Sequence, residues 1–319
     1  MRFKHSLLVF IDNIATTYKV LIYKLIVLAI VTALSLAVIL PSLNVVQSTA
    51  EYVALSEEIK AFFANVSALK LTNLDTSFDT IKAQLGDFMQ VLTSNGLLAI
   101  DVVCAIVILF INYFLTAIGD FGLGEIVNNR MMLRAHTPYT ATLLKDLRRA
   151  SLYAIIYTPI SLLFYAIGGV IIWAVAFKAL AFAPILAKLF VAATLTILLF
   201  ALKYAFTTDW MPRLLHTNCT NRKAIAYCLK PKKGAFLRVL STLIFMVIFI
   251  FVINAVCCLL TFGAALILTI PAGTILLTCY QFVNYCDNNS LKFFIDDYVI
   301  IGPQKEAKMT IEEFFKGDL

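Results

Sequence analysis

The stretch that decides the fold is NRKAIAYCLKPKKGAFLRVLSTLIFMVIFIFVINAVCCLLTF, residues 221–262. Its first eighteen residues hold six of the 26 Lys and Arg of the chain, and its last 24 hold no charged residue. An apolar helix needs about 20 residues to cross the hydrocarbon of a bilayer. The abrupt change from cationic to apolar residues therefore predicts a membrane-spanning helix with its start on the positively charged side.

Composition extends this prediction to the whole chain. Its 319 residues are 61% hydrophobic and 14% charged, with a mean hydropathy of +0.89, whereas soluble domains run at about 45–50% apolar and 25% charged residues. We therefore expect an all-α integral membrane protein. The net charge of +7 alone would suit a nucleic-acid binder, but its confinement between long apolar runs argues against nucleic acid as a partner.

Six apolar runs are long enough to span a bilayer, and other segments flank or connect them. The predicted transmembrane helices are 20–40, 96–118, 151–177, 182–204, 239–262 and 263–286, and the last two adjoin in a tight turn at Gly263. The predicted remaining segments are an interfacial N-terminal helix (1–19), an extracytoplasmic segment (41–95), two basic cytoplasmic loops (119–150 and 205–238) and a cytoplasmic tail (287–319). The glycine-rich GDFGLGE, residues 119–125, is expected to form a flexible exit from the second span.

The distribution of Lys and Arg predicts the orientation. The two basic loops hold five and seven of these residues, while the segments predicted on the opposite side hold Lys60, Lys70, Lys82 and Lys178. Lys and Arg near span ends stay on the cytoplasmic side. We therefore expect a multi-pass protein of a bacterial-type cytoplasmic membrane with both termini in the cytoplasm.

The extracytoplasmic segment has the clearest periodicity. Apolar residues recur at spacings of three and four over residues 52–69 and again over 74–92, which predicts two amphipathic helices forming a hairpin. Either the two apolar stripes pack together or against the membrane, or they bind a partner protein or a second copy of the chain. The candidate partner-binding residues are Ile59, Phe62, Phe78, Ile81 and Phe88.

Polar residues within predicted spans are candidates for transport, because a charge at the bilayer centre costs at least about 2.5–3.5 kcal/mol. Lys24 and Lys203 lie near the inner ends of their spans, where they are expected to extend their amines to the interface. The intramembrane candidates are Asp101, Lys188, Asn112, Asn254 and Pro271. Asp101 and Lys188 could pair in the outer leaflet, and the alternative is a structural role: hydrogen bonds between helices and a packing kink at the proline.

The basic loops suggest a second kind of site. Cations next to a membrane attract anionic lipid by about 1 kcal/mol per Lys or Arg, although setting the topology also explains their presence. The candidate headgroup-binding residues are Arg148, Arg149, Lys230, Lys232 and Lys233.

Catalytic signatures are missing from the sequence: it contains no HExxH, GxSxG, Walker A or GxGxxG pattern, and the predictions include no catalytic residue, cofactor or metal site. We therefore expect a non-enzymatic protein that acts by binding, with a partner protein at the hairpin or anionic lipid at the basic loops. Its partners would be membrane lipids, with a protein partner or homo-oligomer as a further option. The alternative is a small-solute or ion transporter or channel using kinked third and sixth spans with Asp101 and Lys188.

Overall fold

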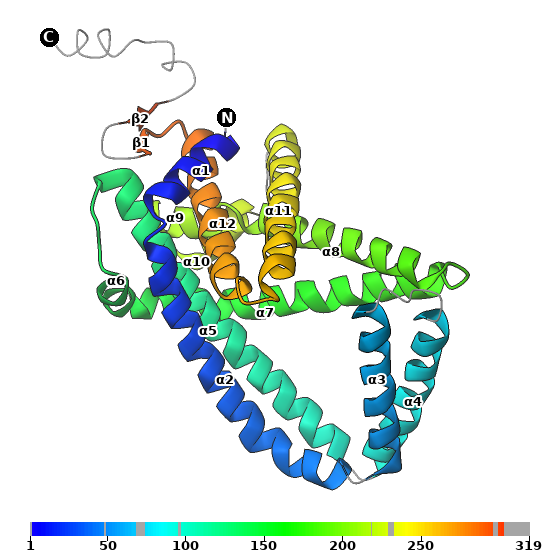
Figure 1. Cartoon of the computed structure of the whole chain (residues 1–319). Coiled ribbons are helices and arrows are strands. Elements are labelled where there is room, and N and C mark those ends of the chain that lie inside the picture. The colour runs from blue at the N-terminus through cyan, green and yellow to red at the C-terminus, as the bar shows by residue number, and fades with distance from the viewer. Residues whose placement is uncertain are drawn as a thin grey trace, which may run out of the picture. The chain divides into compact units, whose positions relative to one another are not determined.

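A computed structural model describes residues 2–47, 49–67, 74–94, 97–217, 219–228, 233–295 and 299–302. It confirms the all-α membrane class, with six helices long and apolar enough to cross a bilayer. These helices are α2 (Thr16–Val46), α5 (Leu97–Leu133), α7 (Leu147–Ile172), α8 (Ile185–Thr207), α11 (Lys233–Thr261) and α12 (Leu266–Asn288) (Figure 1). A π-helix, Trp173–Ala179, continues α7.

Shorter elements complete the described chain. They are α1 (Arg2–Asp12), α3 (Ala50–Ser67), α4 (Leu74–Ser94), α6 (Tyr139–Lys145), α9 (Trp210–Thr217), α10 (Asn221–Cys228) and the two-residue strands β1 (Phe293–Phe294) and β2 (Ile300–Ile301). The strands pair antiparallel, with Phe293 opposite Ile301. The predicted tail continues into residues 303–319, which lie outside the described residues.

The chain divides into two compact units. Residues 1–26, 114–164 and 197–319 form what we call the core unit, and residues 27–113 and 165–196 form the hairpin unit.

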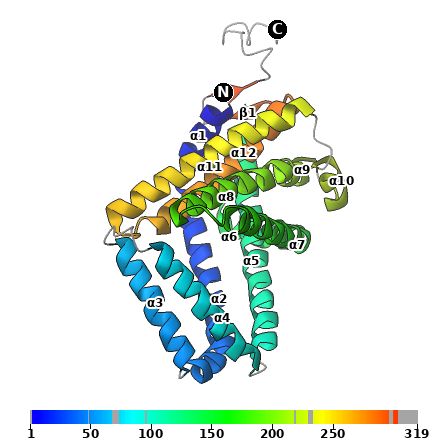
Figure 2. The same cartoon turned by 90° about the vertical axis from the view of Figure 1, so that its right-hand side faces the viewer.

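Helix α12 contains the longest uninterrupted run of buried residues among the described residues of the core unit. Every residue from Ile275 to Cys286 is buried, and α1, α9 and α11 all contact this helix. In Figures 1 and 2, α12 lies beside α1 and α11. A helix that is apolar and buried on all sides belongs in the interior of a bundle rather than against lipid.

The turn between α11 and α12 occurs where the sequence predicts it. Phe262 and Gly263 have positive φ values of 51° and 90°, and the Gly263 N–H donates a hydrogen bond to the Cys258 carbonyl at 2.9 Å. Glycine adopts positive φ without steric cost, so it ends α11 and reverses the chain.

Helix α5 continues through the expected flexible exit and part of the expected loop, ending at Leu133 instead of residue 118. Its glycines permit close packing here rather than flexibility. A Cβ atom at Gly122 would lie 2.8 Å from Leu143 Cδ1, and one at Gly124 would lie 2.6 Å from Met211 Sδ. The longer helix brings Asp120, Glu125 and Arg130 into the interior.

The N-terminal segment also differs from the prediction of one interfacial helix over residues 3–18. Helix α1 ends at Asp12, and a turn over Asn13–Ala15 precedes α2. Phe3 and Leu7 pack against the apolar cluster of α11 and α12, and the Phe3 ring lies 5.1 Å from the Phe245 ring. Ile11, Ile14 and Tyr18, which lie further along the predicted interfacial segment, are exposed.

In the hairpin unit, α3 and α4 pack side by side (Figures 1 and 2). Tyr52 and Phe88 face each other across this pair at 6.2 Å, and Leu55 is buried. The connection that the sequence predicts near Lys70 lies outside the described residues. Whether the hairpin is extracytoplasmic stays a prediction.

Candidate functional site

A polar network ties α1 to the end of α12. The Arg2 guanidinium donates hydrogen bonds to Asn284 Oδ1 at 2.5 Å and to Asp287 Oδ2 at 3.1 Å. Asn284 is 1% exposed, and its amide nitrogen donates to Asp209 Oδ1 at 3.2 Å. Buried polar groups need such partners, so this network fixes α1 on the bundle.

A second network lies deeper in the same unit. Asp120 is largely buried and interacts electrostatically with Lys24 and Lys203. The Lys24 amine donates to Thr274 Oγ1 at 2.7 Å, and the Lys203 amine lies 5.0 Å from the centre of the Tyr157 ring. These ionisable groups come from α2, α5 and α8, so their mutual attraction links helices that are distant in sequence.

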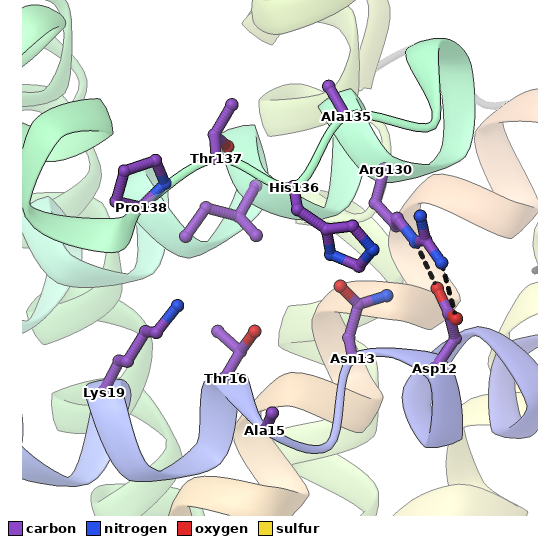
Figure 3. Close-up of a pocket in the computed structure, with 11 residues that line it drawn as sticks. Asp12, Asn13, Ala15, Thr16, Lys19, Arg130, Ala135, His136, Thr137 and Pro138 are labelled. Atoms are coloured by element: carbon purple, nitrogen blue, oxygen red, sulfur yellow. Dashed lines mark hydrogen bonds and ion pairs between the residues drawn. The ribbon is translucent and has the colours of Figure 1, made fainter.

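The third arrangement is a cavity of about 250 Å³ beside the turn between α1 and α2. Its lining residues are Asp12, Asn13, Ala15, Thr16, Lys19, Ile126, Arg130, Ala135, His136, Thr137 and Pro138. Figure 3 shows the His136 ring and the side chains of Asn13, Thr16 and Lys19 extending into the space between the two segments.

The ion pair of Arg130 and Asp12 closes one end of this cavity. The guanidinium donates from Nε to Oδ2 at 2.5 Å and from Nη2 to Oδ1 at 2.8 Å (Figure 3). Such bidentate pairs fix geometry as well as charge. Arg134 has a positive φ of 53°, which ends α5 and turns residues 135–138 over the cavity.

Burial changes the acidity of two groups near these networks that lie outside the spans. The Tyr139 hydroxyl donates to the Gly119 carbonyl at 3.1 Å, and burial, reinforced by Asp120 and Tyr23, raises the pKa of Tyr139. It therefore stays a hydrogen-bond donor at physiological pH. Burial lowers the pKa of His5, while the nearby Asp287 carboxylate opposes that effect.

The exposed surface of the core unit carries charge of one sign in the part the structure describes. Each described carboxylate of this unit is buried or half-buried: Asp12, Asp120, Glu125, Asp146, Asp209 and Asp287. The exposed cations include Lys4, Lys19, Lys145, Arg148, Arg222, Lys223 and Arg238. The acids thus serve internal contacts, and the cations face outward.

The predicted headgroup residues do not form one group. Arg148 is exposed, but Arg149 donates to the Leu214 carbonyl at 2.9 Å and pairs with Asp146 at 3.6 Å. Lys230 and Lys232 lie outside the described residues, and Lys233 begins α11. Of these residues, Arg148 is exposed, and Arg149 keeps 41% of its side chain exposed while it makes both contacts.

The predicted intramembrane residues separate into the two units. Asp101, Asn112 and Lys188 belong to the hairpin unit and are half-buried, whereas Asn254 and Pro271 belong to the core unit. Asn254 Oδ1 accepts a hydrogen bond from Thr269 across the α11–α12 pair, and Pro271 is buried within α12. The contact of Asn254 is the interhelical hydrogen bond that the structural alternative predicted.

The predicted partner-binding residues are partly covered. Ile59 is exposed, while Phe62, Phe78, Ile81 and Phe88 are half-buried. The Phe78 ring stacks on Phe177 at 6.0 Å within the hairpin unit. The most exposed aromatic side chain described on α3 and α4, that of Phe63 at 63%, is not among the predicted residues.

Sequence reasoning missed Asp12, Asp120, Arg130 and His136 as members of interior or cavity-lining groups. The available signal was the helix-compatible stretch of residues 119–133, which contains no proline. Its three glycines favoured a loop instead. Within the described residues, no group of three or more His, Cys, Asp and Glu is placed to hold a metal ion.

Comparisons of the chain with family models, with curated proteins and with solved structures found no match. The candidate function therefore rests on the geometry of the chain itself.

Proposed function

We propose that this chain is a multi-pass protein of the cytoplasmic membrane that acts by binding anionic lipid headgroups through the basic segments of the core unit. The observation that carries the proposal is that, among the described residues of this unit, the charged side chains that are exposed rather than half-buried are cations. Cations such as Arg148, Lys223 and Arg238 are exposed, while the described carboxylates of the unit are buried or half-buried.

The physical argument concerns where each charge can act. A carboxylate that pairs with Arg2, Arg130 or Arg149 is largely neutralised, so it repels an anionic surface only weakly. An exposed Lys or Arg near a membrane contributes about 1 kcal/mol toward anionic lipid, and salt screens this attraction. The internal pairing of acids therefore supports attraction of the basic segments to anionic headgroups, with both termini on the cytoplasmic side.

The two other functions predicted from sequence receive less support. Partner binding at α3 and α4 has exposed apolar residues such as Ile59 and Phe63 but no feature that identifies the partner. For transport, the cavity beside the α1–α2 turn is not lined by Asp101, Asn112 or Asn254. Both stay predictions.

The test compares two variants that remove equal charge from the two units. The full-length chain is reconstituted in nanodiscs of phosphatidylglycerol and phosphatidylcholine, and the lipids retained after extraction are counted by native mass spectrometry. We expect the natural chain to enrich phosphatidylglycerol, less so at high salt. Arg148→Gln with Lys223→Gln should lower this enrichment roughly 30-fold, because about 1 kcal/mol is lost per cation.

The control is Lys60→Gln with Lys82→Gln, two exposed lysines of the hairpin unit, which should leave the enrichment unchanged. Equal losses in both variants, or no preference of the natural chain for phosphatidylglycerol, would refute the proposal.

A further inference from the structure

Hydrogen bonds hold the lining of the cavity beside the α1–α2 turn in place. Asn13 donates its amide hydrogen to the Val9 carbonyl at 2.8 Å, and Arg130 holds Asp12 while also donating to the Arg134 carbonyl at 3.4 Å. The turn and the segment after α5 are therefore fixed before any ligand arrives. A preformed site binds with a smaller loss of conformational entropy than a mobile one.

The charge inside this cavity favours an anion. Asp12 is the single carboxylate of its lining, and Arg130 neutralises it. Lys19 then leaves an unbalanced positive charge, and the His136 ring adds a hydrogen-bond donor. The Thr137 hydroxyl is buried and has no hydrogen-bond partner among the described residues.

The volume of the cavity and its position at the ends of two spans favour an anion that carries a phosphate. About 250 Å³ is several times the roughly 30 Å³ that one water occupies in the liquid, so a group of several heavy atoms fits. The α2 span begins at Thr16 and the α5 span ends at Leu133. The cavity thus lies where two spans end, which is the level of lipid headgroups.

Resting on the proposed lipid binding, we propose that this cavity is a specific site for a phosphate-bearing anion, the headgroup phosphate of an anionic glycerophospholipid. Lys19 and His136 contact the phosphate oxygens, and Asn13 and Thr16 contact the polar remainder of the headgroup (Figure 3). The same chemistry would accept a soluble phosphate monoester, so the test separates the two sources.

The experiment pairs a cavity variant with a matched control in the full-length chain. Lys19→Gln with His136→Ala removes both cavity groups, while Lys4→Gln with His216→Ala removes an exposed lysine and an exposed histidine of the same unit that do not line the cavity. Retained phosphatidylglycerol is measured as above, and Lys19→Arg should keep the binding. We expect a loss of about five-fold or more in the cavity variant, because the Lys19 charge alone contributes about 1 kcal/mol, which is about five-fold in affinity.

Each outcome has a distinct meaning. Equal losses in the cavity variant and the control would overturn the site while leaving general headgroup binding intact. In a second arm, glycerol 3-phosphate and inorganic phosphate are titrated into the protein in neutral detergent. Binding there that disappears in the cavity variant, without any preference for phosphatidylglycerol, would support the phosphate site but refute its lipid source and the proposed function. Absence of binding in both arms would overturn both proposals.

Discussion

The core unit and the hairpin unit are built from the same long helices but are stabilised differently. In the core unit three arginines pair with carboxylates, and Asn284 bonds to both Arg2 and Asp209. In the hairpin unit the described contacts include ring pairs such as Phe78 with Phe177. Its buried apolar side chains, among the described residues, are Val27, Leu55, Ile108, Ala176 and Ile185.

This difference has a physical meaning in a membrane. Lipid solvates apolar side chains as well as protein does, so apolar contacts discriminate little between packed and separated helices. Buried charges of opposite sign strongly favour the packed helices, because separating the charges in an apolar medium leaves each without a partner. The core unit should therefore be the less tolerant of single polar substitutions, and the following predictions test that expectation.

The largest effect is expected at Asp120. In Asp120→Asn, Lys24 and Lys203 lose their shared negative charge, and leaving a buried charge without its partner costs about 3–5 kcal/mol. Unfolding in detergent is followed with a thiol-reactive dye, because Cys279 is fully buried and becomes reactive when the unit opens.

Two further variants test whether the loss of stability in Asp120→Asn comes from the buried charges. Asp101→Asn replaces a half-buried carboxylate of the hairpin unit and should cost less than about 1 kcal/mol. Adding Lys203→Met to Asp120→Asn should recover part of the stability, because it removes one of the two positive charges that Asp120 attracts in the natural chain. A loss at Asp120 no larger than that at Asp101 would show that the buried charges contribute no special stability.

The features of the fold that could be predicted from the sequence are those that depend on residues close together in the chain. The six spans and the turn at Gly263 follow from local patterns, namely apolar length and a residue that adopts positive φ. The role of Asp120 depends on Lys24 and Lys203, which are distant in sequence, and no local pattern contains that information. The cavity requires the α1–α2 turn to meet the segment after α5, a contact that could not be predicted while residues 119–150 were expected to form a loop.

An intermediate effect is expected in the hairpin unit. Phe78→Ala removes a half-buried ring stacked on Phe177 and should cost roughly 1–2 kcal/mol, below the 3–5 kcal/mol typical of Phe→Ala in a full core. Phe63→Ala is the matched control: this phenylalanine is exposed, so the change should stay within about 0.5 kcal/mol. If Phe63→Ala proved as costly as Phe78→Ala, a partner or second copy would have to cover that face.

The smallest effect concerns pH and compares a half-buried with an exposed histidine of the core unit. Burial lowers the pKa of His5 in the folded chain below its ordinary value of 6.5, and its Nδ1 atom is buried without a hydrogen-bond partner in the described chain. As the pH falls below about 6.5, the unfolded chain binds a proton at this position more readily than the folded chain, so stability must decrease. The free energy of unfolding should therefore decline between pH 7 and pH 5.5, and His5→Gln should flatten this decline. His216→Gln, which changes an exposed histidine, should leave it in place, and an unaltered slope in His5→Gln would place the pH sensitivity elsewhere.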